Sequence, residues 1–271
     1  MSSIQIIPIP SIQIIENGDD ILSILFKSMD KIQLKFQDHD ILVIASKVVA
    51  FNEGNLINFS NVKVTDLSKK IAKKAKIPPE FAQVILDECN CRFIGTVPGA
   101  ITTINDYGLL ANAGADQSNV GVGRIVLLPK NIKKSAKYIF HKIKEKTGNR
   151  VSIIIADSRT MPMRLGTVGC ALGTYGFESV IDERGKNDLF NRPMHITTRA
   201  IADQLATAAE LVMGETDEQI PFVIIRNYEH KIINEEAEKD INKLISAQDC
   251  MFIGPLLSCI EKKIEEEISN D

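Results

Sequence analysis

The chain has 271 residues, of which 44% are hydrophobic, so it can bury a large core in one domain or in two closely packed lobes. A formal net charge of -3 at pH 7 gives no electrostatic reason to expect a nucleic-acid partner or an anionic membrane surface. No stretch has the length of a transmembrane helix, and the proline-interrupted N-terminus is not a signal peptide. We therefore expect a cytoplasmic protein without membrane or nucleic-acid partners, whose five cysteines are free thiols.

Apolar runs alternate with helical patterns along the first half of the chain, which predicts a mixed α/β (α+β) fold. The pattern predicts a strand in 3–15, a helix over 21–29 and a buried strand in 40–49 that ends near Ser46-Lys47. It then predicts helices over 65–75 and 78–87, and a strand pair over 90–103. We find no internal repeat, linker or domain boundary, and expect a single domain over 1–260 followed by a charged tail over 261–271.

The second half continues the alternation of strands and helices. Residues 107–129 predict two strands around a polar bend, and Ser135 is expected to cap a helix that closes at Gly148. Residues 151–156 predict a buried strand that ends at a polar loop, 157–160. A polar segment over 177–195, a helix over 198–213 with Leu211 inward, a strand over 220–226 and two charged helices complete the expected elements.

Three acidic residues, Asp116, Asp157 and Glu215, each lie where an apolar element meets a polar loop. Mg²⁺ and Mn²⁺ bind carboxylate and hydroxyl oxygens together with nucleotide phosphates, so these positions are candidates for a metal-phosphate site. The alternative is that the acids and Ser158 only stabilise turns. No P-loop, GxGxxG, GxSxG or HExxH motif is present, which excludes the enzyme classes that those motifs define.

Several sequence blocks occur together in a characteristic order. They are IIENGDD at 14–20, LVIASKVV with NEG at 42–54, NAGADQSNV at 112–120, IIIADS with RLGTVGCALG at 153–173, GKNDLFNRP at 185–193 and IADQLATAAELVMGE at 201–215. In these blocks the chain resembles the coenzyme F420-0:γ-glutamyl ligase family over nearly its whole length. The resemblance implies a two-lobed F420 ligase-like fold with mixed sheets and flanking helices, assembled as an interlocked homodimer.

The resemblance also implies an activity. Such enzymes use a nucleotide, GTP or ATP, and Mg²⁺ or Mn²⁺ to activate a carboxylate as an acyl phosphate, which the amine of L-glutamate then attacks. The acceptor would be F420-0, or a folate as proposed for relatives in organisms that do not make F420. Two other hypotheses remain: an amide ligase for another acid and amine, and a non-catalytic nucleotide-binding protein on the same scaffold.

Site residues carry over by position. The resemblance places catalytic and metal-binding acids at Asp116, Asp157 and Glu215, with Ser158 as a further metal ligand. It places the nucleotide contacts at Ile12, Gln13, Ile14, Ile15, Ser46, Lys47, Asn119, Met213, Gly214, Thr216, Asp217, Glu218, Gln219 and Ile220.

The chain also departs from the family pattern near this site. Phe51 stands where family members commonly have a second lysine, Thr160 and Met161 replace a Gly-Arg pair, and Thr216 and Asp217 replace glycines. Retained acids with altered neighbours suggest a ligase whose acceptor or nucleotide preference has changed. Phe51 is expected either to contact the acceptor or to pack in the core.

Overall fold

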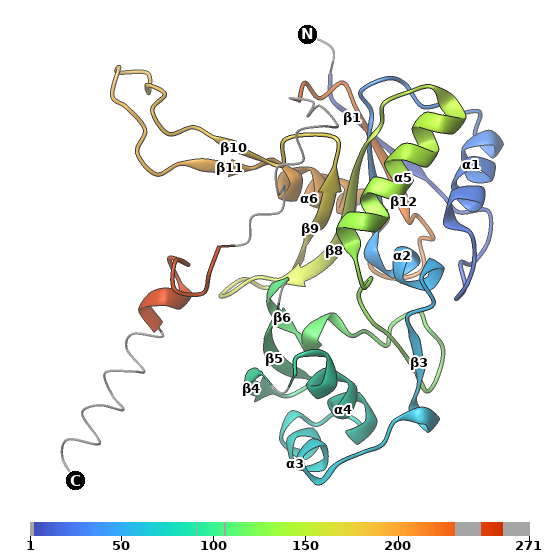
Figure 1. Ribbon diagram of the computed structural model, residues 1–271, viewed down its shortest axis with the longest axis vertical. Coiled ribbons are helices and arrows are strands. Elements are labelled where there is room, and N and C mark those ends of the chain that lie inside the picture. Colours follow the sequence, from blue (N-terminus) through green and yellow to red (C-terminus); the bar gives the residue numbers. More distant parts are fainter. Residues whose placement is uncertain (1–2, 91, 106, 231–244, 257–271) are drawn as a thin grey trace.

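The computed structural model describes residues 3–90, 92–105, 107–230 and 245–256 (Figure 1). Its helices are α1 Ile21–Lys31, α2 Ser46–Asn52, α3 Asp66–Ala75, α4 Pro79–Glu88, α5 Ile132–Thr147 and α6 Ile201–Met213. Its strands are β1 Gln5–Ile9, β2 Ile41–Ala45, β3 Leu56–Asn58, β4 Phe93–Val97, β5 Ala100–Asn105, β6 Gly108–Ala111, β7 Arg124–Val126, β8 Ser152–Thr160, β9 Thr167–Tyr175, β10 Val180–Asp182, β11 Thr198–Ala200 and β12 Phe222–Arg226. Helices and several sheets confirm the prediction of a mixed α/β fold.

The main sheet has five strands in the order β1-β12-β2-β8-β9. The β2–β8 pair is parallel and the other three pairs are antiparallel. The central strands consist of uninterrupted β-branched and aliphatic residues, and residues 41–44 and 153–155 have no exposed surface. Such runs are expected for strands covered on both faces, because every side chain must then be apolar.

Helices cover both faces of this sheet. Helices α1, α2 and α5 pack on one face, where their apolar residues join Leu42, Ile44, Ile153 and Ile155 in one core cluster. Helix α6 packs on the other face, against the alternate residues of the same strands. The approach of α6 to β9 is close: a Cβ at Gly169 would lie 2.6 Å from the carbonyl oxygen of Ala206. Only glycine fits there without displacing the helix.

A second group of elements has its own core. Helices α3 and α4 pack with the three-stranded β4-β5-β6 sheet around a separate apolar cluster that includes Phe81, Ile85 and Ile101 (Figure 1). Thr65 begins α3 with a capping box, in which the Thr65 and Ser68 side chains each bond the other's backbone N–H. The two-lobed description and the interlocked homodimer stay predictions.

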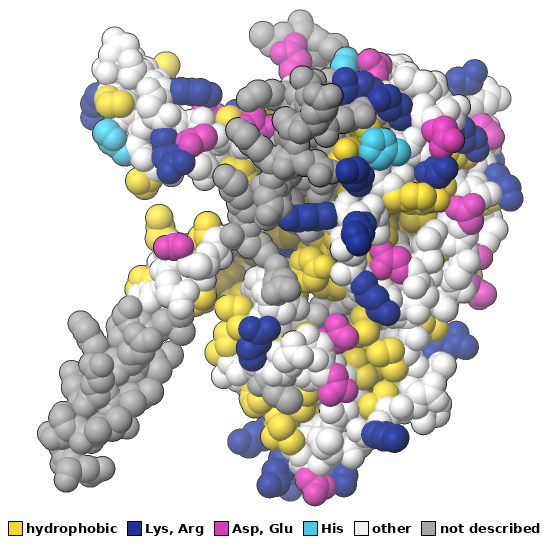
Figure 2. Space-filling model, viewed as in Figure 1, with side chains coloured by type: hydrophobic (Ala, Val, Ile, Leu, Met, Phe, Trp, Pro, Cys, Tyr) yellow, Lys and Arg dark blue, Asp and Glu magenta, His cyan; other side chains and the backbone are white. Residues whose placement is uncertain are grey.

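Strands β10 and β11 form a two-stranded hairpin that projects from the rest of the molecule (Figure 1). The hairpin contains the segment predicted as polar, and ion pairs such as Asp182–Arg184 and Glu183–Lys186, both 2.6 Å, link its side chains. Its tip nevertheless carries large apolar side chains, with Leu189 97% and Phe190 79% exposed. Figure 2 shows hydrophobic and charged side chains intermixed on this arm.

Four predicted details are wrong. The strand ends at Ala45, close to the expected end near Ser46-Lys47, but residues 46–49 of the run predicted as strand belong to α2. The cap of α5 is Asn131, whose Oδ1 accepts a hydrogen bond from the N–H of Lys134, while Ser135 lies inside the helix and donates to Glu53. Leu211 is 80% exposed, not inward.

The fourth error concerns residues 157–160, which are not a loop. They continue β8 and pair with residues 167–170 of β9, so that their polar side chains stand on a sheet extension beyond the core. Local polarity suggested a loop because the sequence alone does not show that a partner strand continues alongside.

The remaining predictions concern composition and the C-terminus. None of the described cysteines, Cys89, Cys170 and Cys250, takes part in a disulfide. In the part of the chain that the structure describes, every helix is too short or too polar to cross a lipid bilayer. The tail over 261–271 and most of the two predicted C-terminal helices lie outside the described residues.

Candidate active site

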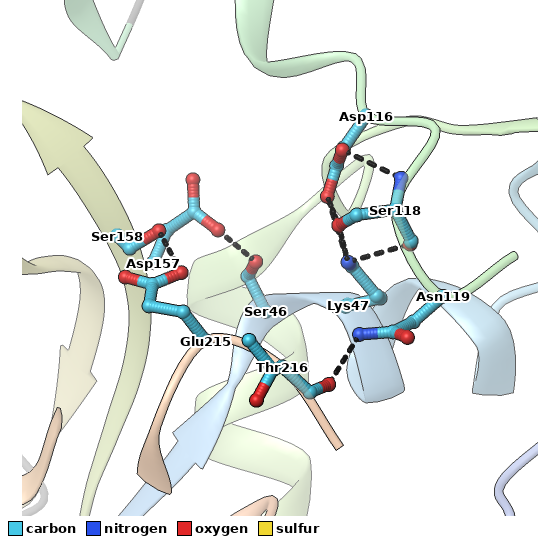
Figure 3. Close-up of polar contacts among 9 residues, drawn as sticks. All are labelled: Ser46, Lys47, Asp116, Ser118, Asn119, Asp157, Ser158, Glu215 and Thr216. Carbon is cyan, nitrogen blue, oxygen red and sulfur yellow. Dashed lines mark hydrogen bonds and ion pairs between the residues drawn. The ribbon is translucent and has the colours of Figure 1, made fainter. Parts of the chain in front are cut away.

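The register of the parallel β2–β8 pair brings Ser46 and Asp157 together. Ala45 pairs with Ala156 in the last rung of this pair, so Ser46 and Asp157 are the first residues beyond it on the two chain segments. There the Ser46 hydroxyl donates a 2.7 Å hydrogen bond to Oδ1 of Asp157 (Figure 3). The carboxyl ends of parallel strands are the edge at which open α/β sheets bind their ligands.

Within the described residues, no Lys, Arg or His forms an ion pair with Asp157. Burial raises its pKa, and the Ser46 hydrogen bond and the charge of Arg159 only partly oppose this effect. The negative charge of Asp116 also raises the pKa, which shows that the two carboxylates are near enough to repel each other. A carboxylate in this setting is stabilised in its ionised form by a cation that binds beside it.

Asp116 is held differently, by Lys47 at the start of α2. The Lys47 ammonium lies 2.7 Å from Oδ2 of Asp116 and also donates to the carbonyl and hydroxyl oxygens of Ser118, each at 2.8 Å. Burial alone would raise the pKa of Asp116, but Lys47 and two hydrogen bonds from Ser118 outweigh it and leave the pKa below its usual value. Asp116 is therefore an ionised carboxylate with its countercharge already in place.

Glu215 reaches the site from the segment after α6. Its two carboxylate oxygens accept hydrogen bonds from the hydroxyls of Ser158, at 3.2 Å, and Thr167, at 2.7 Å (Figure 3). Both hydroxyls stand on the β8–β9 extension, on residues that alternate to the same face of that sheet. The extension thus positions Glu215 one residue along β8 from Asp157.

Glu210 is a further acidic residue near this site, and we did not single it out in the sequence. It lies on α6, where a Cβ at Gly169 would be 2.8 Å from its Oε2 atom. Burial, a hydrogen bond with Glu215 and the charges of Glu215 and Asp157 raise the pKa of Glu210 to about 7. The sequence does contain an indication of this residue, because Glu210 is an acid in the last turn of a largely apolar helix, five residues before Glu215.

The segments predicted to contact a nucleotide lie next to one another. Asn119 donates a 2.8 Å hydrogen bond to the carbonyl of Thr216, which joins the Asp116 loop to the segment 213–220 (Figure 3). The carbonyl of Gln219 in turn accepts from the N–H of Ser11, 2.8 Å away, beside the segment 12–15. Within that segment Ile15 is buried and Ile14 is 71% exposed.

The carboxylate and hydroxyl oxygens of this site suit a hard cation, but in the structure they do not converge on one point. Carboxylates and hydroxyls are the ligands that Mg²⁺ and Mn²⁺ prefer. Across the described residues, no group of three or more His, Cys, Asp or Glu side chains is arranged closely enough to bind a metal ion. Asp116, Asp157 and Glu215 are instead each bonded to a neighbouring Lys or hydroxyl group.

Phe51 packs in the core. It is 6% exposed and belongs to the cluster beneath α1 and α5, so the structure supports packing rather than contact with an acceptor. A lysine at this position would have to bury its ammonium group. The other two departures are accessible: Thr216 and Asp217 are exposed, and Met161 is 45% exposed at the β8–β9 turn.

The family model described as F420-0:Gamma-glutamyl ligase matches residues 10–227. The coenzyme F420:L-glutamate ligase of Methanothermobacter thermautotrophicus is 35% identical, over 83% of this chain and 89% of that protein. The enzyme of the same name from Methanocaldococcus jannaschii is 42% identical over 72% of this chain and 78% of its own length, and that from Methanopyrus kandleri 32% over 90% and 95%. The chain therefore belongs to the F420-0:gamma-glutamyl ligase family of enzymes.

Proposed function

We propose that this protein is a metal- and nucleotide-dependent ligase that joins L-glutamate to the carboxylate of coenzyme F420-0. The observation that carries the proposal is Asp157, which is desolvated just beyond the last rung of the β2–β8 pair and lies next to Ser158, the residue that bonds Glu215, in a chain of this family. Asp116 also stabilises its own loop through Ser118, but Asp157 and Glu215 bond hydroxyl groups of other segments. They suit a reaction in which phosphate charge must be neutralised.

The chemistry proceeds in two balanced steps. A carboxylate oxygen of the acceptor attacks the γ-phosphorus of the nucleotide, which gives an acyl phosphate and releases the nucleoside diphosphate. The amine of glutamate then attacks the acyl carbon, inorganic phosphate leaves, and the nitrogen loses a proton as the amide forms. A bound Mg²⁺ or Mn²⁺ supplies positive charge that offsets the phosphate oxygens.

The residues of this chain have distinct tasks in that scheme. Asp116, Asp157 and Glu215, with the Ser158 hydroxyl, would hold the metal ions. The segments 12–15 and 213–220, with Ser46, Lys47 and Asn119, would bind the nucleotide, GTP or ATP. Lys47, which contacts Asp116 here, would bind phosphate oxygens when a cation takes over the neutralisation of that carboxylate.

Mass spectrometry of the products tests the proposal. Purified protein is incubated with Mn²⁺, glutamate and GTP or ATP, with F420-0 and dihydrofolate supplied in parallel. We expect a product heavier by one glutamyl residue from F420-0. A product from dihydrofolate alone would assign a folate acceptor. Nucleotide binding with no glutamylated product from either acceptor would contradict the ligase and favour a nucleotide-binding protein.

We also propose that the chain forms a homodimer through the β10–β11 arm. Leu189, Phe190 and Ile196 are each more than three-quarters exposed on a hairpin that projects from the body, and a second copy would cover them. Light scattering should give a mass twice that of the 30.0 kDa chain. A Phe190→Asp variant should lower that mass toward the monomer, and a monomeric unmodified protein at micromolar concentration would contradict the dimer.

A further inference from the structure

Arg159 is a cation beside the candidate site whose hydrogen-bonding capacity is largely unused. It follows Asp157 by two residues on β8, so both side chains stand on the same face of the strand. One guanidinium nitrogen donates a 2.9 Å hydrogen bond to the carbonyl of Tyr107, in the β5–β6 turn. This contact fixes the guanidinium between the main sheet and the β4-β5-β6 sheet.

The rest of the guanidinium lacks acceptors. Its Nε atom is buried without a hydrogen-bond partner, and in the described part of the chain no carboxylate lies within 4.0 Å of it. Arginine presents five N–H donors, and a buried donor without an acceptor destabilises the protein. Asp157 interacts with Arg159 electrostatically but not as a close ion pair. The side chain is only partly buried, so an anion from solution can reach the outer nitrogens.

We propose that Arg159 binds the carboxylate of the acceptor and is a determinant of acceptor specificity. This inference rests on the proposed ligase function. In that reaction two anions, the nucleotide phosphate and the acceptor carboxylate, must approach Asp157 together, and each needs a countercharge. The planar guanidinium matches a carboxylate through two parallel hydrogen bonds.

The position of Arg159 favours the acceptor over the nucleotide. Lys47 lies beside Asp116 and Ser118, in the loop that Asn119 joins to the segment 213–220. Arg159 makes its contact with the β5–β6 turn instead, away from those segments. Lys47 and Arg159 therefore both act on Asp157, from different elements. Arg159, which has no carboxylate partner among the described residues, is available to the acceptor carboxylate.

Binding measurements test the inference separately from turnover. F420-0 is titrated by deazaflavin fluorescence, without nucleotide, into the unmodified protein, Arg159→Gln, Arg159→Lys and the control Arg92→Gln, which changes an exposed arginine outside the candidate site. We expect Arg159→Gln to weaken F420-0 binding about 10-fold or more and Arg159→Lys less, while nucleotide affinity stays within about twofold. Arg92→Gln should bind like the unmodified protein.

An acceptor analogue with a neutral carboxamide in place of the carboxylate completes a thermodynamic cycle. It should bind the unmodified protein and Arg159→Gln equally, because neither complex retains the charged contact. Equal loss with the acid and the carboxamide, unchanged acid binding in Arg159→Gln, or an equal loss of nucleotide affinity would overturn the inference. If Arg159→Gln does not fold, as seen in its thermal melt, Arg159→Lys must still discriminate less between acid and carboxamide.

The proposed function and this inference fail differently. A protein that glutamylates F420-0, with an Arg159→Gln variant that binds it normally, keeps the ligase function and loses the role of Arg159. If the unmodified protein glutamylates dihydrofolate, the same titrations are made with dihydrofolate as the acceptor. An unmodified protein that binds and glutamylates neither acceptor loses both.

Discussion

Two carboxylates flank the parallel β2–β8 pair, one at each end, and their surroundings differ. Asp40 precedes β2, is 1% exposed and accepts hydrogen bonds from Arg226 at 2.7 and 2.8 Å and from the N–H of Gln37 at 2.9 Å. Asp157 follows the opposite end, and its hydrogen bond comes from the neutral hydroxyl of Ser46. One buried acid is fully paired within the protein, and the other is not.

The difference in pairing indicates a structural role for Asp40 and a functional role for Asp157. A buried charge that a protein pairs internally ties elements together, here β12 to the turn before β2. A desolvated charge without a neighbouring cation destabilises the folded protein, and residues of that kind concentrate at ligand sites. The Asp40 end therefore stabilises the sheet, whereas the Asp157 end has the electrostatic character of a ligand site.

Replacing Asp40 by Ala should give the largest effect on stability. The change leaves the Arg226 guanidinium, 12% exposed, without its carboxylate, and breaking such a buried pair costs about 3–5 kcal/mol. Urea denaturation followed by circular dichroism measures the loss. Asp30→Ala, an exposed acid on α1, is the matched control and should change stability by less than about 0.5 kcal/mol. Equal stability of the two variants would contradict a structural role for the Asp40 end.

Replacing Asp157 by Asn should weaken nucleotide binding without lowering stability. Because burial raises the pKa of Asp157 in the folded protein, ionisation of this group opposes folding above pH 3.8, and removing the charge leaves stability unchanged or increases it. Nucleotide affinity in the presence of Mn²⁺ should fall at least about 100-fold, as expected on losing a metal ligand. Calorimetric titrations with and without Mn²⁺ measure this. Unchanged affinity with Mn²⁺ would remove Asp157 from the metal site.

Acidic pH should weaken the Asp40 end slightly. His230 lies there, with its Nε2 atom 3.3 Å from Ser152, whose N–H donates to the carbonyl of Asp40. Burial, together with the charge of His39, lowers the pKa of His230 below 6.5, against a hydrogen bond with the Tyr228 carbonyl. Protonation thus favours the unfolded chain, and stability falls as the pH drops below 6.5. The urea midpoints at pH 7.5 and 5.5 should differ less in His230→Asn than in the unmodified protein. If the difference between the two midpoints is the same in both proteins, His230 does not cause the pH dependence of stability.

Parts of this comparison were accessible from the sequence. The apolar runs that end near Ser46 and Asp157 identified two buried strands and the polar residues beyond them, because burial on both faces requires uninterrupted hydrophobic side chains. The blocks shared with the ligase family placed Asp116, Asp157 and Glu215 among the candidate residues before any contact was known. Local sequence also predicted most helices, since capping residues and apolar spacing act within one or two turns.

Other features were decided by the tertiary structure alone. The β2–β8 register sets Ser46 on Asp157, the β9 pairing turns residues 157–160 from a predicted loop into a strand, and the packing of α6 on Gly169 places Glu210 beside Glu215. The first and third depend on residues tens of positions away in the chain, and the second depends on pairing with the next strand. Sequence by itself identified Asp116, Asp157 and Glu215 as candidates, because side-chain type is local. Distances, burial and pKa values came from the fold, because they depend on what long-range packing brings next to each group.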